Sequence, residues 1–158
     1  HMCLFERTKK LLLSGDHVLG DITPNISGSS FETNPLDEYM TSLDKVDLLE
    51  VELVLPAHRR VFRNFHDRVE ELRCHHEVRT AETLSILEQG PQTPYQVATK
   101  MAWRIEAESW QQFPVMQKWF AVGEALAHLL YLEGKGRARK EARLVDSSEH
   151  PVFFYQPV

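Results

Sequence analysis

The stretch "LLLSGDHVLGDITPNIS", Leu11 to Ser27, has two short apolar runs on either side of Ser-Gly-Asp-His. Leu11–Leu13 and Val18–Leu19 predict strand, turn and strand, and the loop-forming residues from Asp21 to Thr33 predict a loop. Two interpretations are open at this point. Asp16 is either an ordinary turn residue or a carboxylate held at the end of a strand to bind a metal ion.

The segment that follows has a clear order of elements. Asn34-Pro35 supplies an N-cap and a first helical proline, and apolar residues then recur at three- and four-residue steps up to Val46. Val51–Leu55 predicts a buried strand that ends at Pro56. Strand, loop, helix and strand in this order are typical of a layered domain of helices and strands.

The composition sets limits on the class of protein. The 158 residues are 42% hydrophobic and 26% charged, as in soluble globular proteins, and the net charge of −5 gives no general reason to expect nucleic acid or an anionic membrane. No apolar stretch reaches the roughly 20 residues of a membrane span. Cys3 and Cys74 form no disulfide framework, so we expect a reduced, cytoplasmic setting. We interpret His1-Met2 as a cloning remnant.

The second part of the chain changes character after Arg60. Helical patterns cover about residues 64–89, 93–103 and 114–132, and β-like pieces cover about 139–145 and 151–155. Three helices and a terminal hairpin predict a winged-helix arrangement, so we divide the chain into residues 1–62 and 63–158. We expect this domain to bury its large aromatic residues, Trp103, Trp110, Trp119 and Phe120.

Two residues are candidate metal ligands. Asp16 and His58 each follow the carboxyl end of an apolar strand, where sheets that carry helices usually present functional groups. A carboxylate and an imidazole are ligands that zinc and related ions accept. Either residue taken alone is more typical of a turn or an exposed surface.

Four motifs, taken in order, resemble one known family. They are Ser14–Gly20 (SGDHVLG), Leu55–His58 (LPAH), His75–Arg79 (HHEVR) and Gly123–Leu129 (GEALAHL). With these motifs the sequence resembles the C-terminal half of a metallo-β-lactamase-fold hydrolase followed by the appended winged-helix domain of that superfamily. The resemblance implies an α+β fold, in which a partial metallo-β-lactamase (αββα) remnant precedes the winged-helix domain.

The resemblance also implies a site and an activity. Asp16 corresponds to the aspartate that bridges two metal ions, and His58 to the last metal-binding histidine. The ions would be zinc, with manganese or iron as the alternatives. The intact parent protein would cleave a small-molecule ester or thioester, or a phosphodiester, with metal-activated water.

The sequence departs from the family at two points. The first metal motif, which lies before the Gly-Asp in the family, has no counterpart here, and Arg59 stands where the family usually has glycine. His17 cannot take the place of that motif, because adjacent strand residues point to opposite faces. Catalytic zinc usually takes three protein ligands. We therefore expect the chain alone to bind metal weakly and to hydrolyse nothing.

The remaining histidines and a basic cluster give weaker signals. His75 and His76 are adjacent on a helix and cannot chelate one ion together, and His128 is expected to be a core histidine. The candidate nucleic-acid contacts are Lys135, Arg137, Arg139 and Lys140, with Arg143 nearby. The long connection before the third helix argues against sequence-specific DNA binding and leaves contact with RNA open. The alternative function is thus a winged-helix interaction or RNA/DNA-binding module without catalysis.

The chain is also expected to form a homodimer. A domain of this kind without its N-terminal part leaves an open strand edge and an apolar face at Leu11–Leu13 and Val51–Leu55. A self-complementary patch tends to close as a two-fold dimer. We therefore expect self-association through residues before about Arg60, with no membrane as partner.

Overall fold

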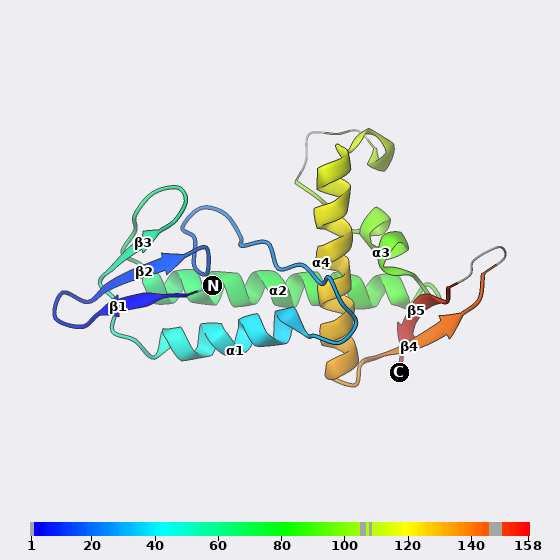
Figure 1. Cartoon of the computed structure of the whole chain (residues 1–158), viewed down its shortest axis with the longest axis horizontal. Coiled ribbons are helices and arrows are strands. Elements are labelled where there is room, and N and C mark those ends of the chain that lie inside the picture. Colours follow the sequence, from blue (N-terminus) through cyan, green and yellow to red (C-terminus); the bar gives the residue numbers. More distant parts are fainter. Residues whose placement is uncertain (1, 105–106, 108, 146–149) are drawn as a thin grey trace. The chain divides into compact units, whose positions relative to one another are not determined.

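The computed structural model describes residues 2–104, 107, 109–145 and 150–158 (Figure 1). These residues contain four α-helices and two small sheets, which confirms the predicted α+β class. In chain order the elements are β1 (Leu4–Glu6), β2 (Leu11–Gly15), α1 (Pro35–Asp47), β3 (Leu53–Pro56), α2 (Phe65–Leu87), α3 (Pro94–Lys100), the 3-10 helix η1 (Trp110–Gln112), α4 (Val115–Gly134), β4 (Ala138–Arg143) and β5 (Val152–Pro157). No helix in the described part of the chain is long and apolar enough to cross a membrane.

The chain forms two compact units. The first unit comprises the residues up to Asn25 together with Glu38–Glu77, and the second comprises Ile26–Asp37 together with Val78–Val158. Helices α1 and α2 each contribute residues to both units. The division between residues 62 and 63 that the sequence suggested stays a prediction.

The first unit contains a three-stranded sheet in the order β1-β2-β3. Strand β1 is antiparallel to β2, and β2 is parallel to β3, with Leu12 opposite Val54. Both of these side chains are fully buried. The helical side of this core is made by fully or almost fully buried residues of α1 and α2: Leu43, Phe65, Val69 and Leu72.

The structure corrects the prediction of a strand at Val18–Leu19. The antiparallel partner of β2 is β1, and residues 16–19 form a turn. His17 N donates to the Ser14 carbonyl at 3.0 Å, and Ser14 Oγ donates to the Val18 carbonyl at 2.7 Å. Val18 and Leu19 are nevertheless buried. The apolar character of Val18 and Leu19 therefore reflects their burial and not a strand. The turn is stabilised by its hydrogen bonds with Ser14.

The second unit contains α3, α4 and the β4–β5 hairpin at the predicted positions. Thr93 begins α3 with a capping box, in which its side chain accepts from Gln96 N while the Gln96 side chain accepts from Thr93 N. Tyr155 of β5 is fully buried in the main core. Residues 146–149, which include Asp146-Ser147-Ser148 between the two predicted β-like pieces, lie outside the described residues. With α2, which covers the first of the three predicted helices, the order of three helices and a hairpin agrees with the prediction, and the winged-helix assignment itself stays a prediction.

The predicted burial of the aromatic residues is wrong for two of the four. Trp119 is 73% exposed and Phe120 is 42% exposed. Trp103 and Trp110 are partly buried and pack against the core. The difference arises because α4 buries residues only from Ala121 onward, so the aromatic residues of its first turns lie beyond the core.

Candidate metal centre

The carboxyl ends of β2 and β3 place the two predicted ligands beside each other. The strands are parallel, with Gly15 opposite Pro56, and Ala57 N donates to the Gly15 carbonyl at 2.9 Å. Gly15 has a left-handed backbone (φ 56°), which lets β2 turn sharply just before Asp16. The sequence thus positions a carboxylate and an imidazole at one edge of the sheet.

The geometry of this pair fits metal binding. His58 Nε2 lies 3.3 Å from Asp16 Oδ1, while the side chains are 65% and 37% exposed, respectively. Asp16 Oδ1 is shielded from solvent and accepts no hydrogen bond from the described residues, so its approach to His58 is close without being a hydrogen bond. Donor atoms about 2.1 Å from a tetrahedral zinc ion lie roughly 3.4 Å apart. An unsatisfied carboxylate oxygen at this distance from an imidazole nitrogen is suited to share a cation with it.

The pair is an incomplete site. Within the described part of the chain, no group of three or more His, Cys, Asp or Glu side chains could hold a metal ion. A zinc site usually takes at least three protein ligands, so Asp16 and His58 could provide only part of one. Their role as ligands stays a prediction.

His17 has a different environment from Asp16. It is 7% exposed, its Nε2 lies 3.1 Å from Ser42 Oγ, and its ring packs edge-on against Tyr39. Burial lowers the pKa of His17, because the charged imidazole loses its hydration. His17 is therefore a buried packing residue.

His76 and His128, each on a helix, are packing residues. His76 of α2 is almost fully buried and contacts the rings of Tyr39 and His75 edge-on. His128 of α4 is fully buried, with Nδ1 2.8 Å from the Glu124 carbonyl oxygen, which confirms the prediction of a core histidine.

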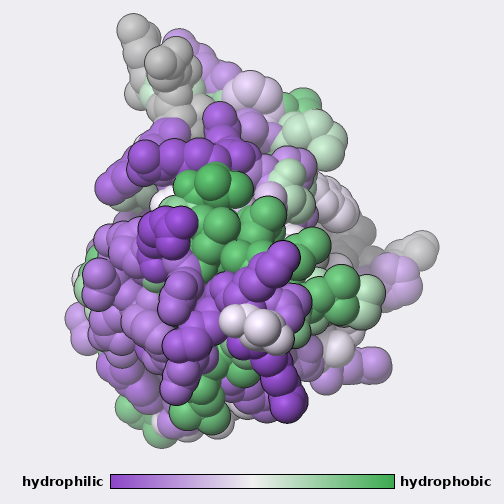
Figure 2. Space-filling view, turned by 90° about the vertical axis from the view of Figure 1, so that its left-hand side faces the viewer, coloured by the Kyte–Doolittle hydropathy of each residue, from purple (hydrophilic) through white to green (hydrophobic). Residues whose placement is uncertain are grey.

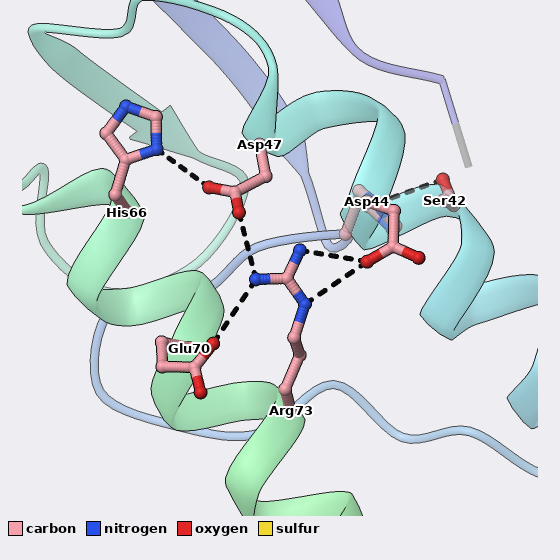
Figure 3. A network of polar contacts seen from close by, with 7 residues as sticks. Ser42, Asp44, Asp47, His66, Glu70 and Arg73 are labelled. Atoms are coloured by element: carbon pink, nitrogen blue, oxygen red, sulfur yellow. Dashed lines mark hydrogen bonds and ion pairs between the residues drawn. The ribbon is translucent and has the colours of Figure 1, made fainter.

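A network of charges joins α1 to α2, and the sequence analysis did not find it. Figure 3 shows Arg73 of α2 between Asp44 and Asp47 of α1, at 2.9 Å from each carboxylate, while His66 Nδ1 lies 2.7 Å from Asp47. Glu70 adds a third carboxylate at 3.4 Å from Arg73. Only the Glu70–Arg73 spacing of three residues was a visible signal, because the other partners come from a separate helix.

The network also affects ionisation. Burial disfavours the charged form of Asp47, but hydrogen bonds from His66 and Arg73 outweigh burial and lower the pKa of its carboxyl group. Arg73 is thus the shared cation of three carboxylates, and His66 adds a hydrogen bond to one of them. The arrangement is that of a structural clamp between two helices.

The basic cluster of the second unit is largely occupied by internal contacts. Lys135 lies 2.7 Å from Asp37, and Lys140 lies 3.5 Å from Glu133. Arg139 donates to the Gln156 side-chain oxygen at 2.7 Å when that amide is oriented to present its oxygen. Arg137 is exposed, and its side chain forms no hydrogen bond or ion pair with the described residues. Nucleic-acid binding by this cluster stays a prediction. Two of its lysines form ion pairs within the protein, so fewer of its positive charges are unpaired than the sequence suggested.

Comparisons with known proteins show that the chain is similar to lactamase-like proteins. It is 34% identical over 87 residues to the lactamase-like protein vrtG of Penicillium aethiopicum and 33% identical over 90 residues to the lactamase-like protein aptB of Emericella nidulans. These matches cover 55% and 57% of this chain but only 26% and 27% of those proteins. No family model matches the sequence.

Solved structures match the whole chain. A β-lactamase domain protein from Burkholderia ambifaria matches with a TM-score of 0.85 and 32% identity, and this chain covers 44% of it. A metallo-β-lactamase family protein from Thermus thermophilus matches with a TM-score of 0.77 and 26% identity, with 45% of it covered. The chain is therefore related to the metallo-β-lactamase superfamily, and it corresponds to less than half of those solved chains. The resemblance seen in the sequence is confirmed at this level.

Proposed function

We propose that this chain is the C-terminal part of a metal-dependent hydrolase of the metallo-β-lactamase superfamily. Its parent would cleave an ester, a thioester or a phosphodiester. The observation that carries the proposal is the meeting of Asp16 and His58 at 3.3 Å, with the carboxylate oxygen lacking a hydrogen bond. The relationship to lactamase-like proteins supports it.

The residues of this chain would supply two ligands to a pair of zinc ions. Asp16 would offer its carboxylate oxygens and His58 an imidazole nitrogen to hold the ions. Bound in such a pair, zinc would lower the pKa of a water molecule and stabilise negative charge on the reacting group. The turn at Gly15 and the hydrogen bond from Ala57 N would keep the two donors in place.

The outer face of the first sheet supports the idea that the parent contains a further layer over this sheet. Leu4, Leu13 and Leu55 lie in register across β1, β2 and β3, on the face opposite Leu12 and Val54. Leu4 and Leu13 are exposed. Figure 2, which views the side where this sheet lies, shows hydrophobic surface among polar residues. Sheets that include parallel strands usually bury both faces, so a second layer would cover these leucines.

A zinc titration tests the proposal. We expect the chain to bind zinc weakly by isothermal calorimetry at pH 7, with binding lost in Asp16→Asn and in His58→Ala. The matched control is His66→Ala, which removes another exposed histidine that is paired with an aspartate. Equal binding by wild type and His58→Ala would overturn the proposal.

The same outer face leads to our proposal that the isolated chain forms a homodimer. Two copies can cover each other's leucines when no other layer does so. Sedimentation at micromolar concentration should give about twice the 18.3 kDa of one chain. Leu13→Glu should return the chain to a monomer, and a clean monomer in the wild type would rule the dimer out.

A further inference from the structure

Two non-glycine residues in the described part of the chain have a left-handed backbone, Lys10 (φ 52°) and Arg59 (φ 69°). This conformation is sterically unfavourable for an ordinary L-residue, because Cβ comes too close to the following carbonyl oxygen. Lys10 lies between β1 and β2, and its ammonium group lies 2.9 Å from Glu50 and 3.7 Å from Glu52. Ion pairs therefore accompany the strained backbone at Lys10.

Arg59 has no such contacts. The neighbouring Arg60 donates to both carboxylate oxygens of Asp21, at 3.0 and 3.2 Å, and Arg63 donates to the Glu52 carbonyl at 3.5 Å. The Arg59 side chain is exposed and forms no ion pair or hydrogen bond with any residue that the structure describes. Neither packing nor a local ion pair explains an arginine in this conformation.

The position of Arg59 beside His58 suggests a role for its positive charge in ligand binding. Arg59 directly follows His58, so the two Cα atoms are about 3.8 Å apart. The turn that carries both residues is tied to the end of β2 by the Ala57–Gly15 hydrogen bond of 2.9 Å. A long arginine side chain at this point can reach a ligand that approaches Asp16 and His58.

The chemistry of the side chain indicates the ligand. A guanidinium group binds carboxylate and phosphate groups through two parallel hydrogen bonds. Strained backbone tends to occur where a side chain is held for function. From the uncompensated guanidinium and its place beside His58, we infer that Arg59 binds the oxyanion, a phosphate or a carboxylate, of the ligand that reaches the Asp16–His58 pair. This inference rests on the proposed function.

The first test measures anion binding to the metal-free chain in EDTA at low ionic strength. Phenyl phosphate and benzoate are titrated separately, and the backbone amide signals of residues 57–60 are followed by NMR. We expect saturable shifts in the wild type, at least threefold weaker binding in Arg59→Gly, and an intermediate affinity in Arg59→Lys. The stronger of the two anions identifies the preferred group.

The matched control is Arg7→Gly, which removes another exposed arginine from a turn of the same unit. Its anion binding should equal that of the wild type. Unchanged binding in Arg59→Gly would overturn the inference, as would an equal loss in Arg7→Gly, because general charge would then explain the effect.

The second test measures thermal unfolding. Arg59→Gly should raise Tm by about 1–3 °C, because the relief of left-handed strain exceeds the larger unfolded-state entropy of glycine. Arg59→Lys should leave Tm unchanged, and Arg7→Gly should not raise it. A lower Tm in Arg59→Gly would overturn the claim that the position is strained.

The two proposals fail separately. Anion titration is carried out without metal, so an absence of zinc binding would overturn the proposed function and leave the Arg59 result standing. Unchanged anion binding in Arg59→Gly would overturn only the inference about Arg59.

Discussion

The first unit contains two pairs of an aspartate and a histidine, and they differ in how well they are satisfied. Asp47 and His66 are 2.7 Å apart, and Arg73 lies 2.9 Å from the other Asp47 oxygen. Asp16 and His58 are 3.3 Å apart, and Asp16 Oδ1 accepts no hydrogen bond from the described residues. The same residue types can therefore build a hydrogen-bonded structural link in one place and leave a carboxylate oxygen without a hydrogen bond in another.

The difference follows from the elements that carry each pair. Asp47 and His66 come from helices α1 and α2, and Arg73, two turns further along α2, completes the contacts of Asp47. Asp16 and His58 come from tight turns after paired strands, where the backbone fixes the donors. Four expected outcomes test this difference between the two pairs.

The largest effect is expected from Arg73→Ala. The change leaves Asp44, Asp47 and Glu70 close together without the cation that now contacts all three. Lost charged hydrogen bonds and carboxylate repulsion should reduce the free energy of unfolding by about 2 kcal/mol. Urea denaturation followed by tryptophan fluorescence measures the change. A loss below about 0.5 kcal/mol would show that the network is only a surface feature.

A smaller effect should appear in the pH dependence of stability. The pKa of Asp47 is lowered in the folded protein, so the unfolded state binds a proton first as the pH falls. The stabilisation is fully present above the ordinary pKa of about 3.9 and is lost as the pH falls through the lower, folded-state value.

Asp47→Asn removes this contribution, since an amide does not titrate. Urea denaturation of wild type and variant between pH 3 and 6 should show a difference in stability that shrinks toward low pH. A difference that stays constant across this range would contradict the assignment of the effect to Asp47.

Much of the fold could be predicted because it depends on local signals. Asn34-Pro35, Gly90-Pro91 and Thr93-Pro94 mark helix ends in the sequence, and helices end or begin close to each of them in the structure. The prediction failed at Val18–Leu19, where a buried turn has the same apolar composition as a short strand. It also failed at Trp119 and Phe120, since the extent of a core depends on distant partners.

The candidate site shows the same limit. The strand ends suggested Asp16 and His58, because their positions follow from the order of strands. The link from His66 to Asp47 needed the packing of α1 on α2, which no local spacing reveals. Arg59 could be noted in the sequence as a departure from the family, but its left-handed backbone appears only in the structure.

A small effect is expected from Asp16→Asn in the metal-free chain. This change keeps the side-chain shape and removes a carboxylate that accepts no hydrogen bond at Oδ1 from the described residues. The free energy of unfolding should change by less than about 0.5 kcal/mol, as at other positions whose contacts are not needed for folding. The matched comparison is Asp47→Asn, which should destabilise the protein more. Equal losses in the two variants would remove the distinction between the pairs.

The smallest expected effect is on catalysis by this chain. With zinc or manganese added, turnover of generic thioesters and phosphodiesters should not exceed that in buffer, because Asp16 and His58 supply only two of the ligands that a catalytic ion needs. Spectrophotometric assays with the His58→Ala variant as a blank measure this. Turnover well above that blank would mean that the described residues already hold a working centre. The statement that Asp16 and His58 form only part of a metal site would then be wrong.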